Sequence, residues 1–287
     1  MPSYKTHAIH GEVILPSIMP KTEINIEDLK AYCMGPDALI VTDYRIFELQ
    51  HAKDTREYFK TLLKQIKKNK LQDNSEVMAF LYGQLDHFIL DLIMHPLIYY
   101  MTEDMPRKHL MEPHGLIENL IDEYVMEKYN KNEVNYYKKA NISDRKLIKI
   151  INESYKKVYN ANNISIKYSM GMRLISLYDK LIRRDKLLLA KYVMKVINFG
   201  DISYHGDSKR AMPYLNLEHN LWYNPETGDV HLESFDNLWY KAIEVALETI
   251  NDVNMYLYQD KTIVNPIIND DLSLLLVSCL SKISEDS

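Results

Sequence analysis

The sequence predicts an all-α fold, with a single multi-helix domain over residues 1–287 that divides into a half at 1–128 and a half at 142–287. Three observations predict this. Gly (8) and Pro (10) together supply only 18 of the 287 residues, too few for the many tight turns of an all-β fold. Apolar residues recur at helical spacing along most of the chain. One stretch, 75–95, is apolar on nearly every side, which is typical of a buried central helix.

Three helices are clear in the first half. Residues 54–69 carry an apolar stripe opposite a lysine-rich face. The helix at 75–95 begins at Ser75, which is expected to cap it. It is expected to end at His95, because the proline that follows disfavours helical backbone in the residue before it. Residues 113–128 open with a proline, which suits the first position of a helix.

The second half begins after a polar connection at 129–141. Ser143 and Ser165 are expected to cap its first two helices. Residues 200–235 contain spaced Asn, Gly and Pro and are expected to form loops, which either cover the site or only connect helices. Helices are expected at 143–159, 165–183, 185–198 and 235–257, with a last apolar segment at 271–283.

Composition limits the classes of function. The formal net charge is −5 and the isoelectric point lies near 6.1, so electrostatics gives no argument for a nucleic-acid or anionic-membrane partner. Cys33 and Cys279 lie far apart and indicate neither a disulfide framework nor a cysteine zinc site. No secretory signal and no run of about 18 uncharged apolar residues is visible, so we expect a cytoplasmic protein without a membrane span.

Candidate metal ligands lie in the first half. His87, Asp91 and His95 are spaced by four, which places them on one stripe of the central helix. A single histidine there is more often an ordinary buried polar residue, but three such groups on one apolar helix favour a metal site. His114 and Glu118 repeat the spacing on the next helix and could chelate zinc or form a surface hydrogen bond. Further candidates, each with an ordinary structural interpretation when taken alone, are His7, His10, Asp37, His51 and Asp122.

Taken together, these residues resemble the zinc-dependent phospholipase C family. The segments that carry the resemblance are THAIHGEVIL, GPDALI, FELQHAKD, AFLYGQLDHFILDLIMHP and HGLIENLID, over roughly residues 5–125, with a weaker echo at 220–246. The resemblance implies an all-helical fold with two to three zinc ions. It implies one ion at Asp37, His51, His87 and Asp91, a second at His95, His114 and Glu118, and a third at Asp91 and His7.

One departure concerns the third ion. Secreted bacterial members of the family use the amino terminus of the mature protein as a ligand, whereas here Met1 lies only six residues before His7. We therefore expect a third site that is incomplete, uses His10 or holds a labile ion. The roles of His10, His109 and Asp122 stay open.

The resemblance also implies the reaction. We expect hydrolysis of phosphoric esters, in which a zinc-bound hydroxide attacks phosphorus and Asp37 orients or deprotonates the nucleophile. The expected substrate is a phospholipid or another phosphate ester, and an intracellular phosphodiesterase of the same fold that acts on something other than lipid is an alternative. Related single-strand nucleases make nucleic acid an alternative that the acidic charge disfavours, and Tyr99 and Tyr100 are interpreted as core residues rather than a stacking surface. A non-catalytic zinc-binding protein is the third alternative.

Overall fold

The computed structural model describes residues 4–18, 22–51, 55–103, 113–131, 142–183, 208–259, 261–263, 265 and 268. In this part of the chain the structure is helical apart from connections and one two-stranded hairpin, so the all-α prediction is confirmed. The helices of the first half are α1 (Tyr4–Ile14), α2 (Ile26–Tyr32), α3 (Tyr44–Gln50), α4 (Thr55–Lys68), α5 (Ser75–Thr102) and α6 (Pro113–Lys128). Those of the second half are α7 (Arg145–Tyr159), α8 (Ile164–Arg183) and α10 (Phe235–Gln259).

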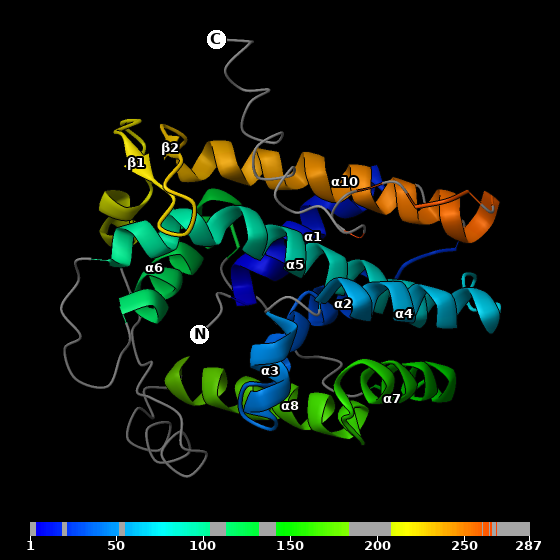
Figure 1. Ribbon diagram of the computed structural model, residues 1–287. Coiled ribbons are helices and arrows are strands. Elements are labelled where there is room, and N and C mark those ends of the chain that lie inside the picture. The colour runs from blue at the N-terminus through cyan, green and yellow to red at the C-terminus, as the bar shows by residue number, and fades with distance from the viewer. Residues whose placement is uncertain are drawn as a thin grey trace.

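Helix α5 is the buried central helix that the sequence predicts. Its first four turns are enclosed almost completely, with α10 and α2 packed against it (Figure 1). Among the described helices, α5 alone is long and apolar enough to cross a membrane, yet 78% of its most apolar window is buried inside the protein. This burial is what a core helix requires.

The prediction that this helix ends at His95 is wrong, because α5 continues through Pro96 to Thr102. A proline inside a helix removes one backbone hydrogen bond and costs about 3 kcal/mol. The turn after it buries Leu97 and Ile98, which are 1% and 7% exposed. Burying two such side chains contributes about 1.5–3 kcal/mol each and offsets that cost.

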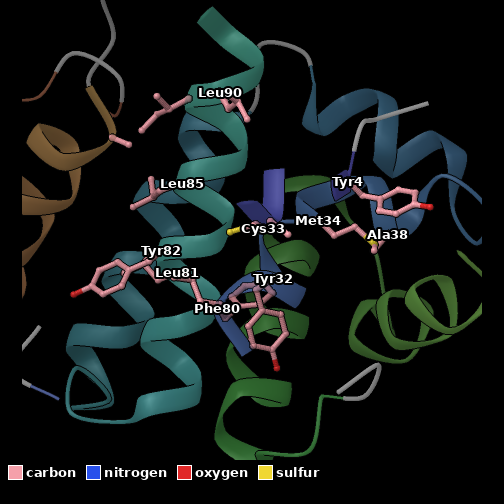
Figure 2. Packing of buried hydrophobic residues seen from close by; sticks show 14 of the residues in the cluster. Tyr4, Tyr32, Cys33, Met34, Ala38, Phe80, Leu81, Tyr82, Leu85 and Leu90 are labelled. Carbon is pink, nitrogen blue, oxygen red and sulfur yellow. The ribbon is translucent and has the colours of Figure 1, made fainter. Parts of the chain in front are cut away.

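The close approach of α2 to α5 depends on Gly83. A β-carbon at this position would lie 2.6 Å from the carbonyl carbon of Tyr32 and 2.8 Å from the nitrogen of Cys33. Figure 2 shows Tyr32 and Cys33 inserted beside the Phe80 and Leu81 turn of α5. The end of α2 can therefore reach the centre of α5 only where a side chain is missing.

Most predicted helices agree with the structure to within about two residues, but their caps differ. Asn74, one residue before the expected Ser75, caps α5 by accepting from the Val77 N–H. Asp144, one residue after the expected Ser143, accepts from two backbone N–H groups of α7. Ser165 lies inside α8, where its hydroxyl accepts from the Asn152 amide. In each case a nearby Asn or Asp offers an equally good or better acceptor.

The structure contains short elements that the sequence prediction did not include. The short helices α2 and α3 were not expected, because seven residues are too few to establish a helical period. The described part of the expected loop region 200–235 is mostly turns and connections, but it also contains two short 3₁₀ turns and a hairpin that was not expected, formed by β1 (Trp222–Tyr223) and β2 (Val230–His231). The helix expected at 185–198, the apolar segment at 271–283 and most of the 129–141 connection lie outside the described residues.

Candidate metal centre

The stripe of α5 forms one wall of the candidate site. His87, Asp91 and His95 lie on successive turns, and the Asp91 carboxylate stands between the two rings. Asp91 Oδ2 is 3.1 Å from His87 Nε2, and Asp91 Oδ1 is 3.1 Å from His7 Nε2 on α1. The two oxygens of one carboxylate thus face different histidines, as the expected bridging role of Asp91 requires.

Two further side chains reach this wall from the segment after α2. Asp37 lies in the short 3₁₀ helix η2 (Gly35–Leu39), and His51 caps the C-terminus of α3. His51 Nε2 is 3.1 Å from Asp37 Oδ1, and His87 Nε2 is 3.7 Å from Asp37 Oδ2. We call His7, Asp37, His51, His87 and Asp91 the inner group.

Two of the three histidines of the inner group are oriented by backbone carbonyls. His51 Nδ1 lies 2.8 Å from the Phe47 carbonyl, and His87 Nδ1 lies 3.1 Å from the Cys33 carbonyl. If each Nδ1 carries the proton and donates it, Nε2 is the atom left to bind a metal. The close approach of α2 at Gly83 therefore has a chemical consequence, because it supplies the carbonyl that fixes the His87 ring.

Gly35 makes room for that ring. Its φ of +58° lies in the left-handed region, and a β-carbon there would lie 2.2–2.7 Å from three atoms of the His87 imidazole. Only glycine adopts this backbone without strain and without overlapping the ring. The Gly-Pro-Asp sequence thus places Asp37 and accommodates His87 in the same turn.

A second cluster, which we call the outer group, consists of His95 on α5 with His114 and Glu118 on α6. Glu118 Oε1 is 3.0 Å from His114 Nε2 and 3.4 Å from His95 Nε2. The two imidazoles are stacked, with 5.1 Å between ring centroids and 4° between planes. His95 Nδ1 lies 2.9 Å from the Asp91 carbonyl, so its Nε2 also faces the carboxylate.

Asp122, one turn beyond Glu118, lies behind the centre. Its Oδ1 accepts hydrogen bonds from both the N–H and the hydroxyl of Thr6, each at 2.8 Å. Because Thr6 precedes His7, this contact fixes the start of α1 and the histidine beside it. The sequence left open whether Asp122 is exposed or supports a ligand, and the structure places it in the supporting position.

His10 does not join either group. It is fully buried, its Nδ1 lies 2.6 Å from Asp86 Oδ1, and its ring meets the edge of Trp239 at 4.8 Å. The expectation that His10 completes a third site therefore finds no support in the geometry. His109 lies outside the described residues.

The electrostatics of the centre favours cations. Burial by itself would raise the pKa of Asp91, but nearby imidazoles, above all His95 and His87, hold it well below its ordinary value. Burial would lower the pKa of His95, yet Asp91 and Glu118 raise it to about 9. Hydrogen bonds to Asp37 and Asp91 likewise raise the pKa of His51 well above its ordinary value, against the effect of burial. Protons on these imidazoles balance the carboxylates wherever no metal is bound.

The donor atoms fit zinc. Two ligands at 2.0–2.2 Å from one tetrahedral zinc ion lie about 3.3–3.6 Å apart. The close histidine–carboxylate pairs of the centre have nitrogen–oxygen distances from 3.0 to 3.7 Å, and all donor atoms of each cluster lie within 4.8 Å of one another. Buried atoms of the centre that have no hydrogen-bond partner in the described residues include His7 Nδ1, Asp37 Oδ2, His87 Nε2 and His114 Nδ1. Nitrogen and oxygen donors in this mixture are the ligands that zinc takes in catalytic sites.

Tyr99 was interpreted as a core residue, and this is wrong. It is 43% exposed and stacks on both His95 and His114, at 5.3 and 5.1 Å between centroids. Burial of its inner part, followed by the charges of Asp91 and Glu118, raises the pKa of Tyr99 to about 12, so the phenol stays neutral. The four-residue spacing of the stripe, continued past His95, is the signal that would have found it.

Comparison with known proteins agrees with the geometry. The family model described as zinc dependent phospholipase C matches residues 6–165, more than half of the chain. All eight side chains of the inner and outer groups lie within the matched segment. Neither the curated proteins nor the solved structures include a match to this chain.

Proposed function

Because the chain belongs to the zinc-dependent phospholipase C family, we propose that it hydrolyses the phosphodiester bond of a phospholipid at the inner and outer groups. The observation that carries the proposal is the convergence of three carboxylates and five imidazoles from separate segments, in clusters whose donor atoms lie within 4.8 Å of one another. Zinc ions bound here would supply Lewis-acid chemistry, polarising a phosphoryl oxygen and lowering the pKa of a water.

The chain's own residues are proposed to divide the remaining work. The imidazoles of His51, His87 and His95 are held in place by the carbonyls of Phe47, Cys33 and Asp91, so the ligand cage is rigid before substrate arrives. Asp37 is proposed to hold the attacking water and accept its proton at Oδ2, an atom that has no hydrogen-bond partner among the described residues. Tyr99, half-exposed over the outer group, is proposed to shield one side of the bound phosphate from water.

The first test is zinc content, measured by mass spectrometry on untagged protein purified without chelators. We expect two to three zinc ions per chain, together with hydrolysis of phosphatidylcholine and of a soluble chromogenic phosphodiester. Single-stranded DNA forms the comparison arm, and cleavage of DNA in preference to both esters would favour the nuclease alternative. Protein that holds no zinc and takes none up would overturn the catalytic assignment.

A conservative substitution tests the role of Asp37. Asp37→Asn keeps the size of the side chain and one oxygen but removes the proton acceptor. We expect turnover to fall by roughly 10²–10³-fold, the range for removing one general base or one oriented electrostatic group. If the zinc content of the variant falls with its turnover, Asp37 acts mainly as a ligand.

A further inference from the structure

The hairpin of β1 and β2 has two unlike faces. The register pairs Trp222 with His231 and Tyr223 with Val230. Trp222 and His231 face inward, are 3% and 5% exposed, and stack at 4.4 Å between centroids. Because side chains alternate along a strand, the neighbouring residues face outward. These outward residues are all apolar or aromatic and all exposed, by 67, 43, 68 and 51% for Leu221, Tyr223, Val230 and Leu232.

This outer face is held in one shape. The Asn216 side chain donates to the carbonyls of Leu232 and Glu233 and accepts from the Asn220 N–H, which ties the two ends of the hairpin together. The Trp222 indole also donates to the Glu233 carbonyl. The hairpin is therefore a preformed element and does not need a partner to fold.

The hairpin lies beside the outer group. The Tyr223 ring meets the Tyr100 ring edge-on at 4.9 Å, and its hydroxyl donates to the Glu103 carboxylate. Both contacts are on the last turn of α5, next to Tyr99, which stacks on His95. The exposed apolar face thus adjoins the rim of the metal centre, as Figure 1 shows for the hairpin and the end of α5.

The charge around the hairpin distinguishes between the partners that could bind its outer face. No Lys or Arg occurs from Ala211 to Tyr240. The acidic residues of the same stretch are Glu218, Glu226, Asp229, Glu233 and Asp236, of which Asp236 is paired with Lys128 at 2.6 Å. This charge repels nucleic acid and anionic lipid, whereas the cationic end of a zwitterionic lipid headgroup is attracted. Aliphatic side chains with a tyrosine among them suit the boundary between headgroups and acyl chains.

We infer that the outer face of the hairpin docks the protein on a zwitterionic phospholipid surface. The inference rests on the proposed function, since it supplies the means by which the metal centre reaches a phosphodiester that lies in a lipid layer. Contact of the four outward side chains with lipid brings the adjoining end of α5 to the headgroups. Docking and hydrolysis are separate events, because the outward side chains of Leu221 and Val230 are not part of the inner or outer group.

The test compares two double variants. Leu221→Ser with Val230→Ser removes the two most exposed aliphatic side chains of the hairpin, while Ile166→Ser with Met170→Ser removes two comparably exposed ones from α8. Binding to vesicles of phosphatidylcholine is measured by sedimentation, and the same vesicles enriched in phosphatidylglycerol form the second arm. We expect the hairpin variant to bind at least about tenfold more weakly than wild type and the α8 variant to bind as wild type does. We expect anionic lipid to weaken binding.

Hydrolysis of a soluble chromogenic phosphodiester separates docking from catalysis. We expect the hairpin variant to keep wild-type turnover of the soluble ester and to lose turnover on vesicles. Equal vesicle binding by the two double variants overturns the inference. So does a loss of turnover by the hairpin variant that is as large on the soluble ester as on vesicles. A wild-type dimer that dissociates in the hairpin variant overturns it as well. Hairpin-dependent vesicle binding by a protein that hydrolyses no ester leaves the inference standing and removes the proposed function.

Discussion

The inner and outer groups use the same ligand chemistry but are built differently. The inner group draws on α1, η2, α3 and α5, and its Asp37 and His87 side chains are 2% and 1% exposed. The outer group draws on α5 and α6 alone, and His95 and His114 are 19% and 24% exposed. One inner ligand, His51, is more exposed than either, at 28%. Carbonyls orient two of the three inner imidazoles, those of His51 and His87, and one of the two outer imidazoles, that of His95. The Nδ1 atoms of His7 in the inner group and His114 in the outer group have no hydrogen-bond partner in the described residues. The inner group therefore draws on more of the fold and contains the most deeply buried ligands, and each group has one exposed side.

The largest effect should come from breaking the inner group. His87 belongs to two of the three candidate clusters, so His87→Ala removes a ligand from both. We expect it to lose inner zinc and at least about 10²–10³-fold in turnover. His114→Ala should lose only the outer zinc and retain the inner metal, as zinc counted per chain would show. Equal zinc content in the two variants would contradict the distinction between the groups.

A substitution that replaces no ligand should also distinguish the inner group from the outer group. In Gly35→Ala, the new β-carbon overlaps the His87 ring and the backbone at φ +58° is strained. We expect inner zinc affinity to fall by about 10–100-fold, the usual effect of disturbing the groups that orient a ligand, with outer zinc unchanged. Zinc affinity is measured by competition with a chromogenic chelator.

Gly228 provides the matched control for this substitution. It also has positive φ, at +76°, but a β-carbon there meets nothing within 4 Å. Gly228→Ala should therefore carry only the backbone strain, about 1–2 kcal/mol of unfolding free energy, with zinc affinity unaffected. Loss of zinc in both variants would trace the effect to strain rather than to the ring.

The sequence predicts those features of the centre that depend on local helix spacing, and it does not predict those that depend on packing between distant segments. The i, i+4 spacing places His87, Asp91 and His95 together, because helix geometry alone determines that stripe. The Cys33 carbonyl could not be predicted, since its contact with His87 depends on a tertiary approach at Gly83. Helices α2 and α3 were missed because they are short.

Tyr99 was missed for a different reason. Pro96 indicates the end of a helix by local rules, and only the packing of the following turn shows that α5 continues. Sequence therefore predicts the ligands better than their supports, because ligands have fixed spacing and supports arise from packing between distant segments.

Zinc binding by the outer group should depend on pH. The pKa of His95 is raised to about 9, so at pH 7 the metal-free outer group carries a proton that zinc must displace. Outer zinc affinity should rise by up to about tenfold per pH unit between pH 7 and 9 and level off above that. Calorimetry in two buffers of different ionisation enthalpy measures the protons released. His114→Ala is the control, because it removes the outer site, and an unchanged proton release in that variant would contradict the assignment.

The smallest effect concerns Asp122, which supports α1 behind the inner group. Burial raises its pKa from 3.8 to about 7, despite Lys5 and the hydrogen bonds from Thr6. In the folded protein the carboxyl stays protonated to a higher pH than in the unfolded chain, so its contribution to stability is complete below about pH 4 and is lost as the pH rises through 7. Asp122→Asn is neutral at every pH and keeps an oxygen for Thr6. We expect the variant to be more stable than wild type at pH 8, by a few kcal/mol at most, since one pKa unit corresponds to about 1.4 kcal/mol.

Urea unfolding of the zinc-free protein at pH 4.5 and pH 8 measures this difference, which should fall to about a quarter at the lower pH. Asp144→Asn is the control, because Asp144 caps α7 at the surface and its hydrogen bonds lower its pKa, against the effect of slight burial. Asn caps a helix about as well as Asp, so we expect a change of less than about 0.5 kcal/mol at either pH. A stabilisation by Asp122→Asn that is equal at both pH values would show that packing, and not the buried charge, limits stability at the start of α1.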